Sequence, residues 1–285
     1  MKELSIKVTS EYDGIKIVDY MRRALTLSAT LVKKVKYGGV FINDVNVHMR
    51  ATVKCGDTVR IVLPNESSDG IRPIKMPLDI IYEDEHLIAI NKPTDMPTHP
   101  SLGNSLPTLA EGLMAYFECK NFVFRSINRL DRDTSGIVIV AKDAFSADKL
   151  SEKMKKGGYL KKYLAVVSGV PSPAHSIIDA PIARETDGAI KRVVRDDGKR
   201  AITEYTVKKI LDNGDSLCEI TLHTGRTHQI RVHMAYIGHP LRDDFLYGER
   251  KEGKSYLLHA GHIEFTHPFT NERITLVSKA GFENE

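Results

Sequence analysis

The stretch at 128–143, NRLDRDTSGIVIVAKD, places four charged residues directly before a continuous apolar run. The charged residues are Arg129, Asp131, Arg132 and Asp133, and the apolar run is typical of a buried strand. Neighbouring cations keep a carboxylate ionised. An ionised, fixed carboxylate can act as a nucleophile or stabilise positive charge, and it is a poor general acid. Asp131 is therefore a candidate reagent, and a salt-bridged turn is the alternative interpretation.

The segment DTSG at 133–136 has the composition of a tight turn. Asp, Thr and Ser side chains accept bonds from nearby backbone N–H groups, and Gly adopts the backbone angles that such turns need. We therefore assign Asp133 to the turn and keep Asp131 as the candidate reagent.

A second charged motif, TGRTHQIRVH, occupies 224–233 and leads into a predicted helix at 228–237. In that helix His228 and Arg231 would stand three residues apart on one face. Arg226 and Arg231 each carry a planar guanidinium, which offers two parallel donors to a carboxylate or another anion. The motif predicts a site for an anion or a carboxylate partner.

Histidines cluster toward the end of the chain and raise the alternative of a zinc site; they are His223, His228, His233, His239, His259, His262 and His267. None belongs to a His-Glu-x-x-His pattern, and His228 and His233 are spaced poorly for one helical face. The arginines beside them disfavour a cation. The sequence predicts no metal and no cofactor.

The third motif is KKYLAVVSG at 161–169. Strand alternation puts Tyr163, Ala165 and Val167 on one face, with Leu164 and Val166 on the other. Tyr163 can be an ordinary core aromatic. Alternatively, its ring can stack on a planar base while its hydroxyl moves a proton.

The elements that must position these motifs are mostly strands. Strand-like segments are LIAINKP, GIVIVAKD, YLKKYLAVVSG, AITEYTVKKI, SLCEITLHTG and GHIEFTHP, and helical patterns occupy 108–118, 144–156 and 228–237. Many strands with few helices predict an α+β fold built on a mixed, mainly antiparallel sheet.

The N-terminal part reads as a separate small α/β module. Two amphipathic helical segments lie within 15–36, with Ser28 as an N-cap, and short strand-like pieces follow. The proline-rich stretch PNESSDGIRPIKMP then reads as a linker. We divide the chain into a module at 1–63, a linker at 64–78 and a main domain at 79–285.

Charge follows this division. Residues 1–64 hold 11 Lys/Arg against 6 Asp/Glu, whereas the remainder holds 30 against 31. A basic module on a nearly neutral body suggests contact with something anionic, and a merely solvated basic face is the alternative.

Composition indicates an ordinary soluble protein of a reducing compartment. No apolar run approaches the roughly 20 residues that a bilayer span needs, and the first residues, MKELSIKVTSEYDGIK, do not form a signal peptide. Cys55, Cys119 and Cys218 are widely separated and odd in number, which disfavours a disulfide framework. We expect a cytoplasmic protein.

The three motifs, in this order, resemble those of the RluA family of pseudouridine synthases. INKPTDMPTHPS, PIARETDGAIKRVV, GKRAITEYTV and LHAGHIEFTHP support the resemblance, which covers about residues 79–277. Residues 12–63 are similar to the αL RNA-binding module of a small-subunit ribosomal protein, on LSATLVKKVKYGGVFINDVNV and CGDTVRIV.

The resemblance implies an enzyme that detaches uracil from C1′ of a uridine in RNA and rejoins it through C5. Breaking a glycosidic bond develops oxocarbenium character, which a carboxylate stabilises. By resemblance Asp131 is that carboxylate, and the sequence leaves open whether it attacks C1′ or assists elimination. Tyr163 would stack on the flipped base, and Arg231 would pair with Asp131 and hold it ionised.

The resemblance also implies RNA contacts. Arg129 would contact RNA where the flipped nucleotide leaves a gap in the stack. The further candidates for RNA binding are Arg132, Arg226, His228, Lys33 and Lys34.

Two positions depart from the family pattern. Asn128 stands where the family often has His, and both residues can form hydrogen bonds. Arg242-Asp243-Asp244 replaces the usual Gly-Asp after HPL, a change that we expect to touch none of the three motifs.

Two other classes of function remain open. One is an RNA-binding protein without activity, and the other is a hydrolase of a nucleoside or sugar. Among RNA targets we expect large-subunit ribosomal RNA first and transfer RNA second, acted on by a monomer.

Overall fold

The computed structural model describes residues 3–64, 66, 68, 70–101, 105–118, 122–155, 157–249 and 255–282. Cys119 and part of the predicted linker (65, 67 and 69) lie outside the described residues. Within these ranges, no helix is long and apolar enough to cross a membrane.

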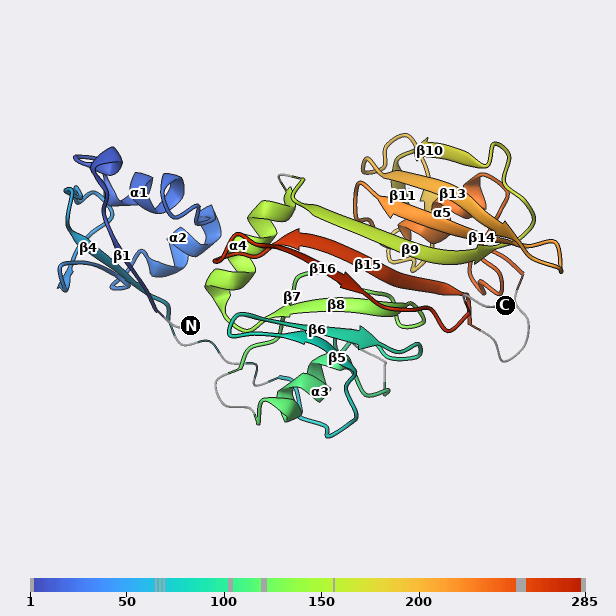
Figure 1. Ribbon diagram of the computed structural model, residues 1–285, viewed down its shortest axis with the longest axis horizontal. Coiled ribbons are helices and arrows are strands. Elements are labelled where there is room, and N and C mark those ends of the chain that lie inside the picture. The colour runs from blue at the N-terminus through green and yellow to red at the C-terminus, as the bar shows by residue number, and fades with distance from the viewer. Residues whose placement is uncertain are drawn as a thin grey trace.

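A ten-stranded sheet forms the main body (Figure 1). Its strands are β5 (Ile80–Glu83), β6 (Leu87–Lys92), β7 (Arg125–Ser126), β8 (Ser135–Ala141), β9 (Tyr159–Val167), β10 (His175–Asp179), β13 (Ile202–Ile210), β14 (Ser216–Leu222), β15 (Leu258–Thr266) and β16 (Arg273–Val277). The order is β10-β13-β14-β9-β15-β8-β6-β5, with β16 beside β15 and β7 beside β8. The predicted mainly antiparallel sheet is confirmed.

One parallel pairing interrupts the antiparallel pattern, where β15 meets β8 through His259 opposite Ser135 and Ala260 opposite Gly136. Gly136 has a φ of 111°, and a Cβ atom there would lie 2.4 Å from the carbonyl oxygen of Ala260. Only glycine fits so close an approach with this backbone angle. The DTSG turn therefore ends where two strands from distant parts of the chain join.

The three predicted helices of the main body are present as α3 (Leu109–Tyr116), α4 (Ala144–Lys155) and α5 (Gln229–Tyr236). Thr108 and Glu111 form a capping box that starts α3. A two-stranded hairpin, β11 (Ile182–Arg184) and β12 (Arg192–Val194), stands beside α5.

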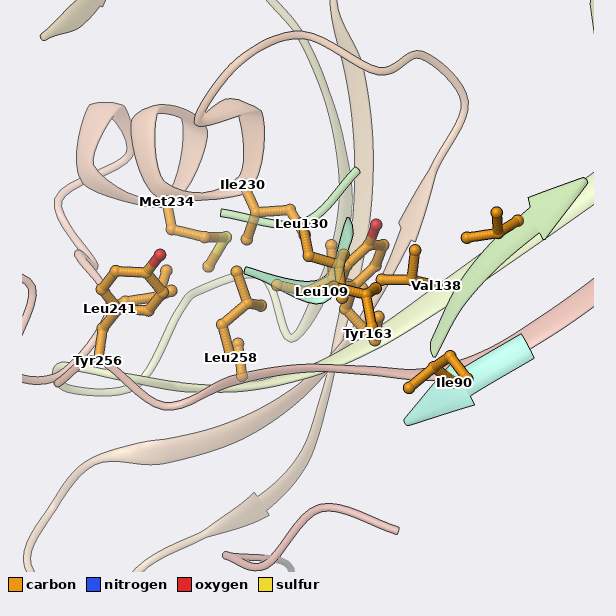
Figure 2. Packing of buried hydrophobic residues seen from close by; sticks show 14 of the residues in the cluster. Ile90, Leu109, Leu130, Val138, Tyr163, Ile230, Met234, Leu241, Tyr256 and Leu258 are labelled. Atoms are coloured by element: carbon orange, nitrogen blue, oxygen red, sulfur yellow. The ribbon is translucent and has the colours of Figure 1, made fainter. Parts of the chain in front are cut away.

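Strand β9 shows the predicted alternation. Tyr163, Ala165 and Val167 belong to the largest apolar cluster, whereas Val166 belongs to a cluster on the other face with Leu164 packed against it. Figure 2 shows Tyr163 among the side chains of the first cluster, with residues of α5 reaching into the same core. The sheet and α5 therefore share one apolar core.

The N-terminal residues form a second sheet with the order β1-β4-β2-β3. Its strands are β1 (Glu3–Lys7), β2 (Val40–Ile42), β3 (Val45–Asn46) and β4 (Thr58–Val62), and its helices are α1 (Ile17–Arg23) and α2 (Ala29–Val35), with the 3₁₀ turn η1 (Ser10–Tyr12). The Ser28 side chain accepts the N–H of Leu31 at 3.1 Å, so Ser28 is the predicted N-cap of α2.

The N-terminal sheet domain contacts α4 of the main body. The Ser28 N–H donates to Asp148 of α4 at 2.7 Å. Ala144 and Phe145 of α4 join the apolar cluster of the N-terminal residues. Glu66, in the predicted linker, pairs with Lys34 on one side and with Arg125 on the other. The domain boundaries stay a prediction, and these contacts define the surface that a truncation would uncover.

Removing residues 1–63 should leave a folded main body, because the clusters that hold the ten-stranded sheet contain no residue of that segment. Uncovering the α4 surface should lower the free energy of unfolding by about 1–3 kcal/mol, the scale of one or two apolar side chains. Urea unfolding of both chains followed by circular dichroism measures this difference. An insoluble or unfolded truncation would show that residues 1–63 complete the core.

Candidate active site

The loop before β8 is anchored at its start by Asn128. The buried Asn128 side chain donates to the carbonyl of Ile137 and accepts the N–H of Ile139, both at 2.9 Å. These bonds tie the loop to the middle of β8. The amide thus provides a donor and an acceptor at the position where the family often has histidine.

Asp131 lies in the middle of this loop with its side chain 35% exposed. Its backbone carbonyl accepts the N–H of Thr134 at 3.1 Å, which closes the turn before β8. Leu130 and Asp133 on either side are buried. The loop therefore presents the Asp131 carboxylate from a backbone that is held on both sides.

Lys92, at the end of β6, ties the turn at Asp131 to the loop that follows β6. Its ammonium group is fully buried and donates to three carbonyl oxygens at 2.8, 2.7 and 3.0 Å, those of Pro93, Met96 and Arg132. Burial lowers the pKa of Lys92 to about 8, and the charges of Asp133 and Asp131 oppose that shift. Three donors meet three acceptors, so one side chain holds both loops.

The arginines beside Asp131 in the sequence do not pair with it. Arg132 donates Nε and Nη2 to the two oxygens of Asp133 at 2.9 and 3.1 Å. Arg129 is exposed. The prediction that neighbouring arginines hold Asp131 ionised is therefore corrected, because Arg132 serves the turn residue Asp133 instead.

The cation nearest Asp131 comes from α5. Arg231 Nη1 lies 3.9 Å from Asp131 Oδ2, and His228 Nε2 lies 3.8 Å from the same oxygen. His228 and Arg231 therefore reach the same carboxylate, but the prediction that His228 belongs to the helix is wrong. His228 is the N-cap, with a left-handed φ of 57°, and this turn of the backbone is what directs its ring to Asp131.

Arg231 makes its two short contacts with Asp244. Its Nε and Nη2 each lie 2.7 Å from an Asp244 oxygen, and both side chains are buried. The expected close pairing of Arg231 with Asp131 is therefore wrong. Asp244 takes the two parallel donors of the guanidinium, and Asp131 lies 3.9 Å from the remaining nitrogen, Nη1. Burial alone would lower the pKa of Arg231, but the bond to Asp244 and nearby negative charge raise it. Arg231 stays a cation.

The expectation that the Arg242-Asp243-Asp244 segment touches none of the three motifs is wrong, because Asp244 binds Arg231 of the second motif. Within that segment Asp244 stands where the family has Asp, and Asp243 stands in place of the glycine. Asp244 Oδ1 also accepts the backbone N–H groups of Leu246 and Tyr247 at 3.0 and 3.2 Å. Asp243 has a left-handed φ of 63°. Glycine, the family's residue here, adopts this backbone conformation with the least strain, and Asp is among the other residues that tolerate it.

Aromatic rings surround the Arg231 guanidinium. Its Cζ lies 4.3 Å from the Tyr256 ring centroid, 5.0 Å from that of Tyr247 and 5.3 Å from that of Phe245. Such faces stabilise a cation that has left water. Tyr256 Oη also lies 3.1 Å from Thr134 Oγ1, which joins this aromatic group to the turn after Asp131.

Tyr163 is buried next to these groups. Burial, followed by the charge of Asp131, raises the pKa of the Tyr163 hydroxyl. The phenol therefore keeps its proton, which favours the stacking role of the ring over proton removal by a phenolate.

The structure brings Asp131, Tyr163, His228 and Arg231 together, and the side chains of the other predicted RNA contacts do not join this group. Arg129, Arg132 and Arg226 are exposed, and Arg226 Nε donates to the carbonyl of Arg200 at 2.9 Å. Lys33 and Lys34 lie on α2, in the N-terminal domain.

Sequence reasoning missed Lys92, Asp244, Tyr247 and Tyr256. The lysine of INKP stands in a stretch that carries the resemblance, so the pattern contained a signal for Lys92. In the part of the chain that the structure describes, no three His, Cys, Asp or Glu side chains are grouped as metal ligands.

Comparisons with known proteins show the family of this chain. The model of the family RNA pseudouridylate synthase matches residues 86–236. "Uncharacterized RNA pseudouridine synthase YjbO" of Bacillus subtilis is 39% identical over 88% of this chain and 90% of its own length. "Ribosomal large subunit pseudouridine synthase D" of Xanthomonas campestris is 35% identical over 84% and 77%. The solved structure "Human RNA Pseudouridylate Synthase Domain Containing 1" matches with a TM-score of 0.60 and 28% identity, over 72% of this chain and 84% of that one.

The chain belongs to the RluA family of RNA pseudouridine synthases. It is an isomerase whose substrate is RNA.

Replacing Arg231 with Leu should lower the free energy of unfolding by about 3–5 kcal/mol, because it leaves the buried Asp244 carboxylate unpaired. Urea unfolding measures this loss. The double variant Arg231→Leu/Asp244→Asn should recover most of the stability, since the amide oxygen still accepts the two backbone N–H groups.

Unlike the stability, the catalytic rate should not recover in the double variant. Both variants should lose at least about tenfold in single-turnover rate if Arg231 also acts on Asp131, and Arg231→Lys should restore only part because an ammonium lacks the fork. A double variant with a normal rate would limit Arg231 to holding the fold.

Proposed function

We propose that this enzyme converts specific uridines of large-subunit ribosomal RNA to pseudouridine, with Asp131 as the carboxylate that acts at C1′. The observation that carries this assignment is the state of the two carboxylates that approach Arg231. Asp244 is buried and accepts two bonds from Arg231. Asp131 is 35% exposed and lies 3.9 Å from Arg231 Nη1 and 3.8 Å from His228 Nε2. Of the two, only Asp131 is available to a substrate.

In the isomerisation the C1′–N1 bond breaks and a C1′–C5 bond forms, while C5 loses its proton and N1 gains one. Positive charge develops at the sugar as the first bond breaks. The negative charge of Asp131 stabilises it, and a fixed carboxylate needs little rearrangement as the charge appears. No second carboxylate is needed to activate water, because the uracil itself returns to C1′.

The surrounding residues support that chemistry. We place the flipped uracil against the ring of Tyr163, which is buried at the edge of the main core cluster near Asp131, and its protonated hydroxyl can donate a hydrogen bond. Arg129 and Arg132 are exposed and lie in the same loop as Asp131, so we expect them to contact the phosphates of a bound strand. Arg231 adds a permanent positive charge 3.9 Å from Asp131.

Ribosomal RNA is the favoured target because relatives that cover most of this chain are named for the ribosomal large subunit. In the N-terminal domain, Lys33 and Lys34 lie exposed on α2 and would contact phosphates. We place the enzyme in the cytoplasm, as a monomer. Carbodiimide-block reverse transcription of ribosomal and transfer RNA, from cells with and without the protein, tests the target. Loss of a stop at one ribosomal position is the expected result, and unchanged stops in all RNAs would refute the function.

Asp131→Asn should lower the single-turnover rate by more than about a thousandfold, because the isosteric amide carries no charge to stabilise the sugar. RNA binding and thermal unfolding should change little. Asp95→Asn is the matched control, since Asp95 is an exposed carboxylate on the neighbouring loop. A rate for Asp131→Asn within about tenfold of wild type would remove Asp131 from the chemistry.

The chain without residues 1–63 should bind RNA more weakly and with a shallower slope of log affinity against log salt, because phosphate contacts release counterions. The rate on saturating RNA should be nearly unchanged, since Asp131 lies in the main body. Filter binding from low to high salt gives both quantities, with Lys33→Ala as the point variant. Equal slopes for all three proteins would mean that the basic face of the module is only solvated.

A further inference from the structure

Two hydrogen bonds lead from the β11–β12 hairpin to His228, whose ring approaches Asp131. The backbone N–H of Arg192 donates to Tyr247 Oη at 2.9 Å. Tyr247 Oη lies 2.8 Å from His228 Nδ1, and the opposite ring nitrogen, Nε2, lies 3.8 Å from Asp131 Oδ2. These four residues belong to separate segments of the chain, so only the fold brings them together.

The direction of these bonds assigns the tautomer of His228. Tyr247 Oη already accepts one hydrogen bond, from the backbone N–H of Arg192. Burial raises the pKa of the Tyr247 hydroxyl to about 12, so the hydroxyl keeps its own proton. Donating the proton to Nδ1 satisfies both groups with the contacts present. Nδ1 is then the acceptor, and the single ring proton sits on Nε2, the nitrogen nearest Asp131.

The surroundings of His228 favour its neutral form. Its side chain is 11% exposed. Burial lowers its pKa, and the cations Arg231 and Arg192 add to the effect, while the carboxylates Asp131 and Asp244 oppose it. Near neutral pH the imidazole is therefore an uncharged donor.

We propose that His228 is a positioning residue for Asp131, acting as a neutral imidazole whose Nε2–H is directed at Oδ2 by the bond from Tyr247 to Nδ1. The proposal rests on the proposed role of Asp131 and replaces the expectation that His228 contacts RNA. The separation of 3.8 Å exceeds a hydrogen bond, and catalytic contacts commonly shorten when substrate binds.

The need for such a donor follows from the engagement of Arg231. Because Asp244 occupies the fork of the guanidinium, Arg231 supplies Asp131 with charge but no short directional bond. A neutral N–H can orient one oxygen without adding a second cation, which would weaken the ability of the carboxylate to stabilise the sugar. His228 and Arg231 thus divide orientation and charge between them.

The first test reads the tautomer directly, in the full-length protein and without any activity assay. Long-range ¹H–¹⁵N correlation spectra of ¹⁵N-histidine-labelled protein at neutral pH should show His228 protonated at Nε2 alone, with His228→Gln assigning the signal. Tyr247→Phe removes the donor to Nδ1, and the signals should shift toward a mixture of tautomers. A proton on Nδ1 in the wild type, or no change in Tyr247→Phe, would overturn the proposal.

The second test compares His228→Gln with His228→Asn. A Gln amide nitrogen reaches the place of Nε2, whereas that of Asn reaches only the place of Nδ1. His228→Gln should therefore stay within about threefold of the wild-type single-turnover rate, and His228→Asn should lose roughly 10- to 100-fold, the range for a lost bond to a charged group. Tyr247→Phe should fall between them. RNA affinity should be the same in all four proteins.

Backbone strain predicts the opposite order, which makes the comparison decisive. Asn tolerates the left-handed φ of 57° better than Gln, so a purely structural role would favour His228→Asn in both rate and melting temperature. Equal rates, a faster Asn variant or a parallel loss of RNA affinity would overturn the positioning role. If the wild type itself forms no pseudouridine in any RNA, the proposed function fails, and the tautomer measurement still decides the state of His228.

Discussion

The buried ion pair between Arg231 and Asp244 is the constraint on which the site depends. A guanidinium that is only 3% exposed is costly unless its charge and its donors are matched. Here two bonds of 2.7 Å to Asp244 and the faces of three aromatic rings satisfy it. These contacts join α5 to the segment that follows HPL and to the start of β15. Loss of either partner of the pair would leave the other charge buried without a counter-charge.

Because Asp244 takes the two parallel donors of Arg231, the two carboxylates near this arginine, Asp244 and Asp131, have different environments. Asp244 is fully buried, is bonded by the fork and accepts two backbone N–H groups as well. Asp131 sits at the edge of the site with its side chain 35% exposed. It approaches only Nη1 of Arg231, the nitrogen that does not bind Asp244. One carboxylate therefore holds the structure and the other faces the substrate. That division places the reactive charge beside a permanent cation without neutralising it in a tight pair.

Around Asp131, the backbone is held by polar side chains from several places in the chain. Asn128 bonds to β8, Lys92 gathers three carbonyl groups, and Gly136 permits the close parallel contact with β15. A chemistry that must keep the detached uracil near its sugar needs such fixed geometry, because a small displacement of a reacting group costs much of the rate. The N-terminal domain stands apart from these contacts and meets the main body at α4 instead.

Local properties of this protein followed from its sequence. The alternation in KKYLAVVSG placed Tyr163 on the face of the main core, and the N-cap of α2 at Ser28 was predicted from its residue type. The motif order indicated the family and offered Asp131 as the reagent. These features depend on neighbouring residues, whose relation the backbone period sets.

The partners of the charged groups were decided by the tertiary structure. Local reasoning paired Asp131 with the arginines beside it, and the family resemblance paired it with Arg231. In the structure Arg132 binds Asp133 instead, and Arg231 binds Asp244, thirteen residues further along the chain. His228 was placed inside a helix, but its left-handed backbone puts it outside, facing Asp131. Ion pairs form between side chains that the fold brings within a few ångströms in a buried environment. Neither that distance nor that burial is a property of a short stretch of sequence, so the structure alone settled which carboxylate is bound and which is open.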